Sequence, residues 1–277
     1  MALTVNTNIA SLNAQRNLSG SASELQTSLQ RLSTGLRINS ARDDAAGLFA
    51  SELIQADVRG LNVAVRNAQD GISLGQVAEG ALGEIANNLQ RIREIAVQSA
   101  NATVQDRTGL QAEVDQLTQE ISRIIQTSEF NGTALLSATS SLTFQVGADG
   151  TASNQVALST TTLTGIAGYS GSLTATGVIN VSTAAASSGA LSSIDTAINT
   201  VSTTRATFGA VQNRFEAVIS NLQNVAESLT AARGRIVDAD FAAETANLTR
   251  AQIIQQAGVS VLSQANALPQ LALSLLQ

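Results

Sequence analysis

Apolar side chains recur at alternating steps of three and four residues over most of this 277-residue chain. This spacing places them on one face of an α-helix and is typical of coiled coils. The pattern appears in five stretches, at residues 18–36, 78–96, 110–124, 191–229 and 254–275. We therefore predict five helical segments and a mainly α fold, in which the N-terminal and C-terminal segments form a long coiled-coil helical hairpin or bundle.

The first and last stretches lie at the two ends of the chain. The apolar face of the first consists of Leu18, Ala22, Leu25, Leu29, Leu32 and Leu36, and that of the last of Ile254, Val261, Leu268 and Leu275. Gly258, Ala265 and Ala272 alternate with the last set and permit a close approach between helices. Pro269 falls within this face and is expected to kink or end its helix.

These end segments need a partner, because most helix stability comes from packing. Burial of each Leu, Ile or Val stabilises by roughly 1.5–3 kcal/mol relative to leaving it exposed. Residues 251–277 carry no charged side chain to keep an isolated helix in solution. We expect the two apolar faces to form a self-assembly core shared between copies. The alternative is a hairpin of the two ends that is complete within one chain.

Charge is distributed almost as a palindrome. Residues 1–15 and 251–277 carry none, and Asp149 is the single charged residue between positions 130 and 194. The blocks in between are rich in arginine, aspartate and glutamate. This symmetry indicates that the two ends of the chain meet in space.

The centre of the chain changes its period. Residues 142–146 and 154–159 alternate, and Gly147 to Gly150 supply turn residues between them. This pattern predicts a small β-hairpin at about 142–159. Residues 160–190 are mostly Thr, Ser, Gly and Ala, so we expect one more short hairpin or an irregular loop that buries little core.

Turn and capping residues suggest where the helices begin and end. Asn131 and Gly132 are expected to end the third helix, and Gly234 to break the fourth. Asp238 or Asp240 can cap the fifth. Arg37, Arg42, Asp43 and Asp44 form a dense charged cluster. We favour a helix-start cap with local ion pairs over a paired-carboxylate catalytic or metal site, because no third ligand or base is nearby.

The composition excludes much chemistry. The chain has no histidine, cysteine, lysine or tryptophan, and its formal net charge is −6. Nucleophiles that depend on His, common zinc sites and disulfides therefore cannot form. We expect a protein that is not an enzyme, needs no cofactor and binds no nucleic acid. No positively charged leader or long apolar run is present, so we expect neither a cleaved signal peptide nor membrane insertion.

The segment Gln90–Gln98 combines an apolar face with charge. Ile92 and Ala96 belong to the helical seam, whereas Arg91, Glu94, Ile95 and Gln98 fall on neighbouring faces and should be at least partly exposed. This surface is either plain solvated surface or an interaction face for another helix or receptor.

Several long motifs in this order resemble those of bacterial flagellins. They occupy residues 6–18, 29–47, 89–101, 127–133, 236–240 and 260–276. The resemblance implies a structural subunit that self-assembles into the flagellar filament for motility, is exported unfolded through the flagellar channel, and is located in the extracellular filament. The expected partners are further copies of the chain, a flagellar export chaperone, and the cap and hook–filament junction proteins.

The resemblance also implies a domain layout. Residues 1–42 and 238–277 would form the terminal coiled-coil core, the inner tube of the filament. Residues 43–160 and 191–237 would form a helical rod domain with the β-hairpin. Residues 161–190 would be a short variable surface segment in place of outer domains.

By the same resemblance, Gln90, Arg91, Ile95, Gln98 and Glu113 would form an inter-subunit face or the site of the Toll-like innate flagellin receptor. Ile95 stands where the motif usually has leucine. Two other functions stay open from the sequence. One is a hook–filament junction protein, and the other is a flagellin-like surface adhesin or polysaccharide-binding protein.

Overall fold

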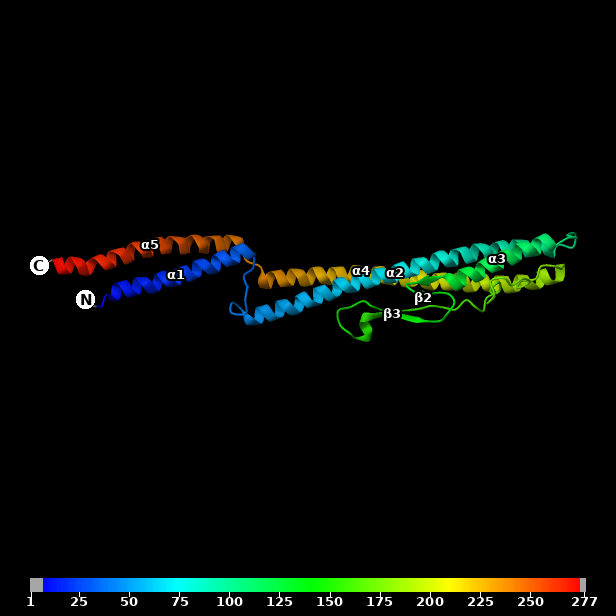
Figure 1. Cartoon of the computed structure of the whole chain (residues 1–277), viewed down its shortest axis with the longest axis horizontal. Coiled ribbons are helices and arrows are strands. Elements are labelled where there is room, and N and C mark those ends of the chain that lie inside the picture. Colours follow the sequence, from blue (N-terminus) through cyan, green and yellow to red (C-terminus); the bar gives the residue numbers. More distant parts are fainter. Residues whose placement is uncertain (1–6, 275–277) are drawn as a thin grey trace. The chain divides into compact units, whose positions relative to one another are not determined.

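The computed structural model describes residues 7–274, with the side chains of the last helix described as far as Ala267. Within this part the chain forms five α-helices (Figure 1). They are α1 (Ile9–Thr34), α2 (Ala45–Ala100), α3 (Thr108–Thr127), α4 (Ala184–Val237) and α5 (Phe241–Ser274). The predicted mainly α fold is confirmed. The chain divides into unit 1, residues 1–56 and 227–277, and unit 2, residues 57–226.

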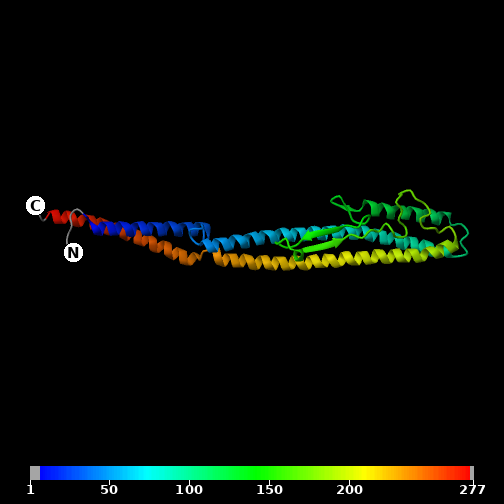
Figure 2. The ribbon, with the colours of Figure 1, turned by 90° about the horizontal axis from the view of Figure 1, so that it is seen from below.

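Unit 1 joins the two ends of the chain. Helices α1 and α5 lie side by side and run antiparallel (Figures 1 and 2). Gly35, at φ 72°, ends α1 in the left-handed conformation, which glycine adopts without steric penalty. Next to it, Leu36 and Asp238 form an isolated antiparallel bridge, and Ala239 N donates to Gly35 O at 2.9 Å. The prediction that the ends of the chain meet is confirmed.

The helix ends of unit 1 agree with those predicted from the sequence at Asp44 and Asp240, but not at Gly234 and Pro269. Asp44 Oδ1 accepts from Gly47 N at the start of α2, and Asp240 Oδ1 accepts from Ala242 N and Ala243 N at the start of α5. Gly234, however, lies inside α4, because an isolated glycine costs only about 1 kcal/mol in a long helix. Pro269 does not end α5, which continues to Ser274, so of the two expected effects, a kink or an end of the helix, the end is wrong.

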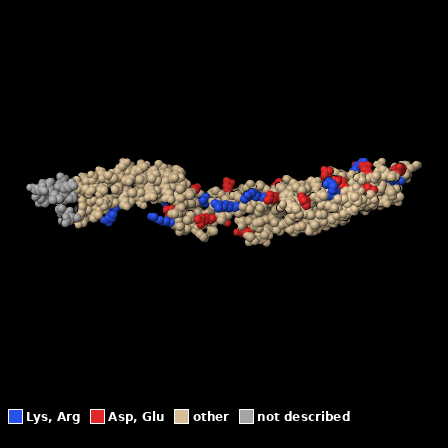
Figure 3. Space-filling view, viewed as in Figure 1, with Lys and Arg blue, Asp and Glu red and all other residues tan. Residues whose placement is uncertain are grey.

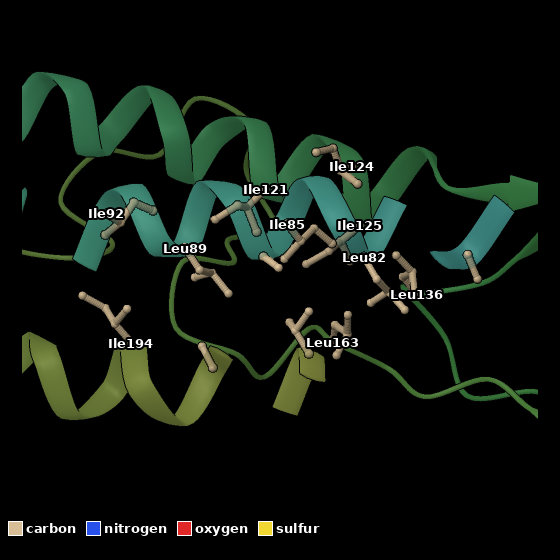
Figure 4. Packing of buried hydrophobic residues seen from close by; sticks show 14 of the residues in the cluster. Leu82, Ile85, Leu89, Ile92, Ile121, Ile124, Ile125, Leu136, Leu163 and Ile194 are labelled. Carbon is tan, nitrogen blue, oxygen red and sulfur yellow. The ribbon is translucent and has the colours of Figure 1, made fainter. Parts of the chain in front are cut away.

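Unit 2 contains the main hydrophobic core, formed by α2, α3 and the part of α4 that belongs to this unit. Leu82, Ile85 and Leu89 of α2 are 0% exposed. They belong to one cluster with Ile121 and Ile125 of α3 and Ile194 of α4 (Figure 4). The second and third predicted seams therefore lie in the core.

A β-hairpin packs beside this core (Figure 2). Strands β3 (Ser141–Gln145) and β4 (Gln155–Ser159) pair antiparallel, with a short 3₁₀ turn, Ala152–Asn154, before β4. The rings of Phe144 in β3 and Phe215 in α4 meet edge to face, with centroids 5.3 Å apart. The predicted hairpin is confirmed, and its inner face closes a small second cluster around Phe215.

A second, smaller hairpin follows α3 directly. Its strands are β1 (Glu129–Phe130) and β2 (Thr133–Ala134), and the turn between them consists of Asn131 and Gly132. These two residues therefore do not end α3, which stops at Thr127. Asn-Gly between two short strands is the preferred pair for a two-residue hairpin turn, so the signal was present in the sequence.

Residues 163–183, which we call the strap, lie along α3. Leu163, Ile179 and Val181 of the strap are buried in the main core, so the expectation that this segment buries little core is wrong. Side chains of α3 hold its backbone. Gln111 Oε1 accepts from Val181 N at 2.7 Å and Asp115 Oδ1 accepts from Gly177 N at 2.8 Å. The helix thus supplies the hydrogen bonds that a neighbouring strand would give, and scattered aliphatic residues then suffice for packing.

Two glycines of α2 provide a matched test of core packing. A Cβ atom at Gly71 would lie 2.6 Å from the ring of Phe215, whereas a Cβ at Gly80 would meet nothing within 4 Å. We expect Gly71→Ala to lower the free energy of unfolding by about 1–3 kcal/mol through overpacking. Gly80→Ala should raise it by about 0.4–1 kcal/mol. Urea unfolding of both variants measures this, and equal effects would contradict the packing around Phe215.

The strap predicts a second contrast, along α3. Gln111→Ala leaves the buried N–H of Val181 without its acceptor and should cost about 1–3 kcal/mol. Gln116→Ala, at an exposed position on the same helix, should stay within about 0.5 kcal/mol. Amide hydrogen exchange at Val181 reports the local loss directly. Unchanged protection of that amide in Gln111→Ala would show that the glutamine does not hold the strap.

Candidate self-assembly and recognition surfaces

Helices α1 and α5 contact each other through small side chains. The buried positions of α1 are Ser11, Ala14, Ser21 and Ser28, and those of α5 are Glu244, Ala251 and Ala265. Gly258 lies in the same seven-residue series, and a Cβ atom there would be 3.4 Å from Leu18 Cδ1. Small residues at every seventh position let two helix backbones approach closely and leave little room for large side chains between them.

This packing shifts the predicted face of α1. Leu18, Leu25, Leu32 and Leu36 are half-buried, but Leu29 is 51% exposed, and Ala22 is also exposed. Within the single chain Leu29 therefore lies outside the contact with α5, and its place in a core shared between copies stays a prediction. The seam runs through Ser21 and Ser28, which a count of apolar residues passes over because serine is polar. The regular spacing of Ala14, Ser21 and Ser28 was the available signal.

The apolar residues predicted on α5 lie beside the seam rather than in it. Ile254 is 43% exposed and Val261 is 56% exposed. The neighbouring Ile253 and Val259 are exposed as well. The side chain of Leu268 and all of Leu275 lie outside the described residues. Outside its seam, α5 thus presents branched aliphatic side chains to solvent, with Ile254 and Val261 on the same flank.

Most of the large apolar side chains that remain exposed among the described residues belong to unit 1. They are Ile9, Leu12, Leu29, Phe49, Leu53, Phe241, Ile253, Ile254, Val259 and Val261. On the face shown in Figure 3, few charged side chains interrupt the surface of the α1–α5 pair. Such a concentration of exposed apolar side chains marks a protein interaction surface.

One ion pair crosses between α1 and α5 in the described part of unit 1. Arg31 Nη1 lies 3.6 Å from Glu244 Oε2, and Glu244 is only 8% exposed. The pair borders a groove of about 350 Å³ whose lining includes Glu24, Asn247 and Arg250. Sequence reasoning missed this pair, because Arg31 and Glu244 are far apart along the chain. We expected local ion pairs for Arg37 and Arg42, but the ion pairs of the described residues include neither of them. Arg37 Nη2 instead donates to Ile236 O at 2.6 Å.

The charged face predicted around Arg91 lies in unit 2. Arg91 pairs with Glu113 of α3 at 2.8 Å and with Glu94 at 3.0 Å. The hydrogen bond to Glu113, and then that to Glu94, raises the pKa of the Arg91 guanidinium above its ordinary value. Gln90 and Gln98 are exposed on the same helix. The structure therefore brings Arg91 and Glu113 together on an accessible surface.

Ile95 is the exception in this set. It is 1% exposed and belongs to the main core, so the expectation that it is partly exposed is wrong. Both α3 and α4 contribute to the core around α2, so the buried face of α2 is wider than a two-position seam. Positions next to Ile92 and Ala96 are therefore covered too.

The described residues offer little for other kinds of site. No group of three or more His, Cys, Asp or Glu among them could hold a metal ion. Over the same part of the chain, none of the helices has the length and apolar character required to cross a bilayer.

Comparison with known proteins gives the family. The model of the bacterial flagellin N-terminal helical region matches residues 5–141, and that of the bacterial flagellin C-terminal helical region matches residues 191–276. Flagellin of Halalkalibacterium halodurans is 43% identical over 276 residues and flagellin of Bacillus subtilis 42% over 304 residues, each alignment covering 99% of both chains. Flagellin B of Vibrio cholerae is 37% identical over 375 residues, with both chains fully covered.

A solved structure titled a putative flagellar hook-associated protein from Vibrio parahaemolyticus shares the fold. Its TM-score is 0.58 at 14% identity, covering 71% of this chain and 100% of that one. The two family models and the relatives aligned over their full length define a structural filament protein. The chain belongs to the bacterial flagellin family and is a subunit of the flagellar filament. The junction-protein and adhesin alternatives are not favoured.

The loop after α1 carries a pH-dependent contact. Asp43 Oδ2 accepts from Ser40 Oγ, Ser40 N and Asn39 N. The Ser40 hydroxyl, followed by the two backbone N–H groups, lowers the pKa of Asp43. Because the folded pKa lies below the unfolded value of about 3.9, the contact contributes stability above that value and loses it as the pH falls through the folded pKa.

We therefore expect an NMR titration of the Asp43 carboxyl group to give a pKa below its ordinary value, with Ser40 N–H shifting over the same range. Asp43→Asn should abolish that shift while leaving the signals of α3 unchanged. An ordinary or raised pKa for Asp43 would contradict the contact.

Proposed function

We propose that unit 1 is the self-assembly core of this filament subunit and that copies associate through the exposed flanks of α1 and α5. The observation that carries this proposal is the division of side chains in the α1–α5 pair. Small residues fill the seam inside one chain, and Leu29, Ile254 and Val261 stay at its outside. The pair is thus joined within one chain and still presents apolar surface to others.

The energetic argument favours association over an isolated pair. Complete burial of each exposed Leu, Ile or Val contributes roughly 1.5–3 kcal/mol, and a helix pair closed over Ser, Ala and Gly gains little of this internally. Neighbouring copies offer the same surface, so repeated contact along a helical polymer recovers the missing burial. We assign Leu18, Leu25, Leu32 and Leu36 to the half-buried edge of this core. Leu268 and Leu275 stay members of the core by the spacing of the sequence alone.

We further propose the domain layout that the family resemblance implies. Residues 1–42 and 238–277 form the inner core, and residues 43–160 with 191–237 form the helical rod domain. Residues 161–190 provide the outer surface in place of added domains. Burial of Leu163, Ile179 and Val181 in unit 2 supports a close-fitting surface segment here.

As a flagellin, the chain is proposed to be secreted unfolded through the flagellar channel and to meet an export chaperone, the cap and the hook–filament junction proteins. The absence of cysteine from the sequence suits this route, because no disulfide can cross-link the chain in transit. We propose no catalytic role.

The accessible pair of Arg91 and Glu113, with Gln90 and Gln98 beside it, supports a second contact surface. We propose that it acts between subunits, and that the Toll-like innate flagellin receptor is its second candidate partner. Ile95 can only support this surface from below, since it is buried.

Introduction of a negative charge on the α5 flank tests the assembly proposal. Ile254→Asp or Val261→Asp would bury an unpaired carboxylate at each contact, at about 3–5 kcal/mol per subunit, and should abolish polymerisation. Electron microscopy of purified, seeded protein gives the readout. Deletion of residues 251–277 should have the same result.

Gln256→Asp is the matched control, because it adds the same charge at an exposed polar position of α5. It should polymerise like the unaltered chain, and all three point variants should keep the unfolding midpoint of unit 2. Filaments formed by Ile254→Asp would overturn the proposed role of this flank.

A further inference from the structure

Asn131 and Gly132 are the only Asn-Gly pair in the sequence, and they form the turn between β1 and β2. Both have positive φ, 49° at Asn131 and 75° at Gly132. Two-residue turns of this kind need left-handed backbone at both positions. Glycine adopts it freely, and asparagine tolerates it better than most residues with a side chain. The turn geometry therefore selects this pair.

The same pair is chemically reactive, because glycine has no side chain to shield its backbone nitrogen. Both residues are exposed, and nothing lies within 4 Å of the position that a Cβ of Gly132 would take. The carboxamide of Asn131 has no hydrogen-bond partner among the described residues. By contrast, Asn101 Oδ1 accepts from Thr103 N, and Asn180 Oδ1 accepts from Ser182 N.

We propose that Asn131 is a site of spontaneous deamidation, at which the chain acquires a negative charge without any enzyme. The backbone nitrogen of Gly132 attacks Cγ of Asn131 and forms a new C–N bond. The bond from Cγ to the amide nitrogen breaks, and the nitrogen leaves as ammonia. Water then opens the resulting cyclic imide at either carbonyl. One opening gives aspartate, and the other gives isoaspartate, in which the main chain runs through the former side-chain carboxyl.

The hairpin around this turn opens easily. Its paired part is short: Glu129 pairs with Ala134 and Phe130 with Thr133, and Leu135 N donates to Ser128 O at 3.0 Å at its base. A two-stranded ribbon of this size has little stability of its own. Exposed turns of this kind can open locally while the rest of the protein stays folded. The turn can therefore leave its folded conformation and reach the geometry of attack while the helices of unit 2 stay intact.

The two products differ in their effect on the fold. Aspartate tolerates the left-handed conformation much as asparagine does, so this product keeps the turn and adds one negative charge to the formal −6. Isoaspartate adds a backbone atom to a two-residue turn and breaks the pairing of Phe130 with Thr133. Phe130 packs against the main core, and Leu135 and Leu136 next to this hairpin are fully buried, so this product loosens the end of α3.

Prolonged incubation of the full-length chain tests the proposal. Aliquots held at neutral and at mildly alkaline pH are cleaved at arginine and mapped by mass spectrometry, with isoaspartate detected by an isoaspartyl methyltransferase. Conversion at Asn131 should exceed that at every other asparagine and should rise with pH, because the attacking nitrogen must lose its proton. Conversion at Asn131 no greater than at Asn101 and Asn180 would overturn the proposal.

Two further samples examine the products. Asn131→Asp reproduces the aspartate product, and its unfolding midpoint should match that of the unaltered chain, with no ammonia released at this site. The isoaspartate fraction, separated by ion exchange, should show faster amide exchange at Leu135. Equal exchange at Leu135 in that fraction would contradict the predicted loosening of the turn.

Discussion

The closure of α1 against α5 over small side chains is the constraint on which the proposed assembly of this subunit depends. A seam of Ala14, Ser21 and Ser28 against Ala251 and Gly258 brings the two backbones close together. Such a seam has little room for large side chains, so Leu29, Ile254 and Val261 remain on the flanks. The same choice of residues therefore joins the ends of one chain and keeps apolar surface available for the next copy.

Unit 2, by contrast, buries most of its large aliphatic side chains within the single chain. Its aliphatic residues from α2, α3 and α4 meet in one core, as Leu89, Ile121 and Ile194 illustrate (Figure 4). Several of its arginines, such as Arg91, Arg93 and Arg205, pair with carboxylates at the surface. Exposed pairs of this kind contribute little to stability, so the core carries unit 2. Unit 2 therefore has a large core of its own, and we propose that unit 1 completes its apolar burial by association.

The strap shows how a segment with few large apolar residues becomes part of a hydrophobic core. Residues 163–183 have few large apolar side chains and no regular period, yet Gln111, Asp115 and neighbouring polar groups of α3 satisfy their backbone. Once its N–H and C=O groups have partners, the segment can bury Leu163 and Val181 without the penalty of unpaired polar groups. The secondary-structure propensity of the strap does not predict its burial, because its hydrogen-bond partners are side chains of another segment, α3.

The sequence by itself determined the five helices, the β-hairpin at 142–159 and the meeting of the two ends, because period and charge distribution are local properties of a chain. Only the tertiary structure decided that Ile95 is buried and that Leu29 lies outside the α1–α5 seam. The apolar period shows which residues share one face of a helix, but it does not show how many neighbouring segments cover that helix. That number depends on packing among segments far apart in the chain.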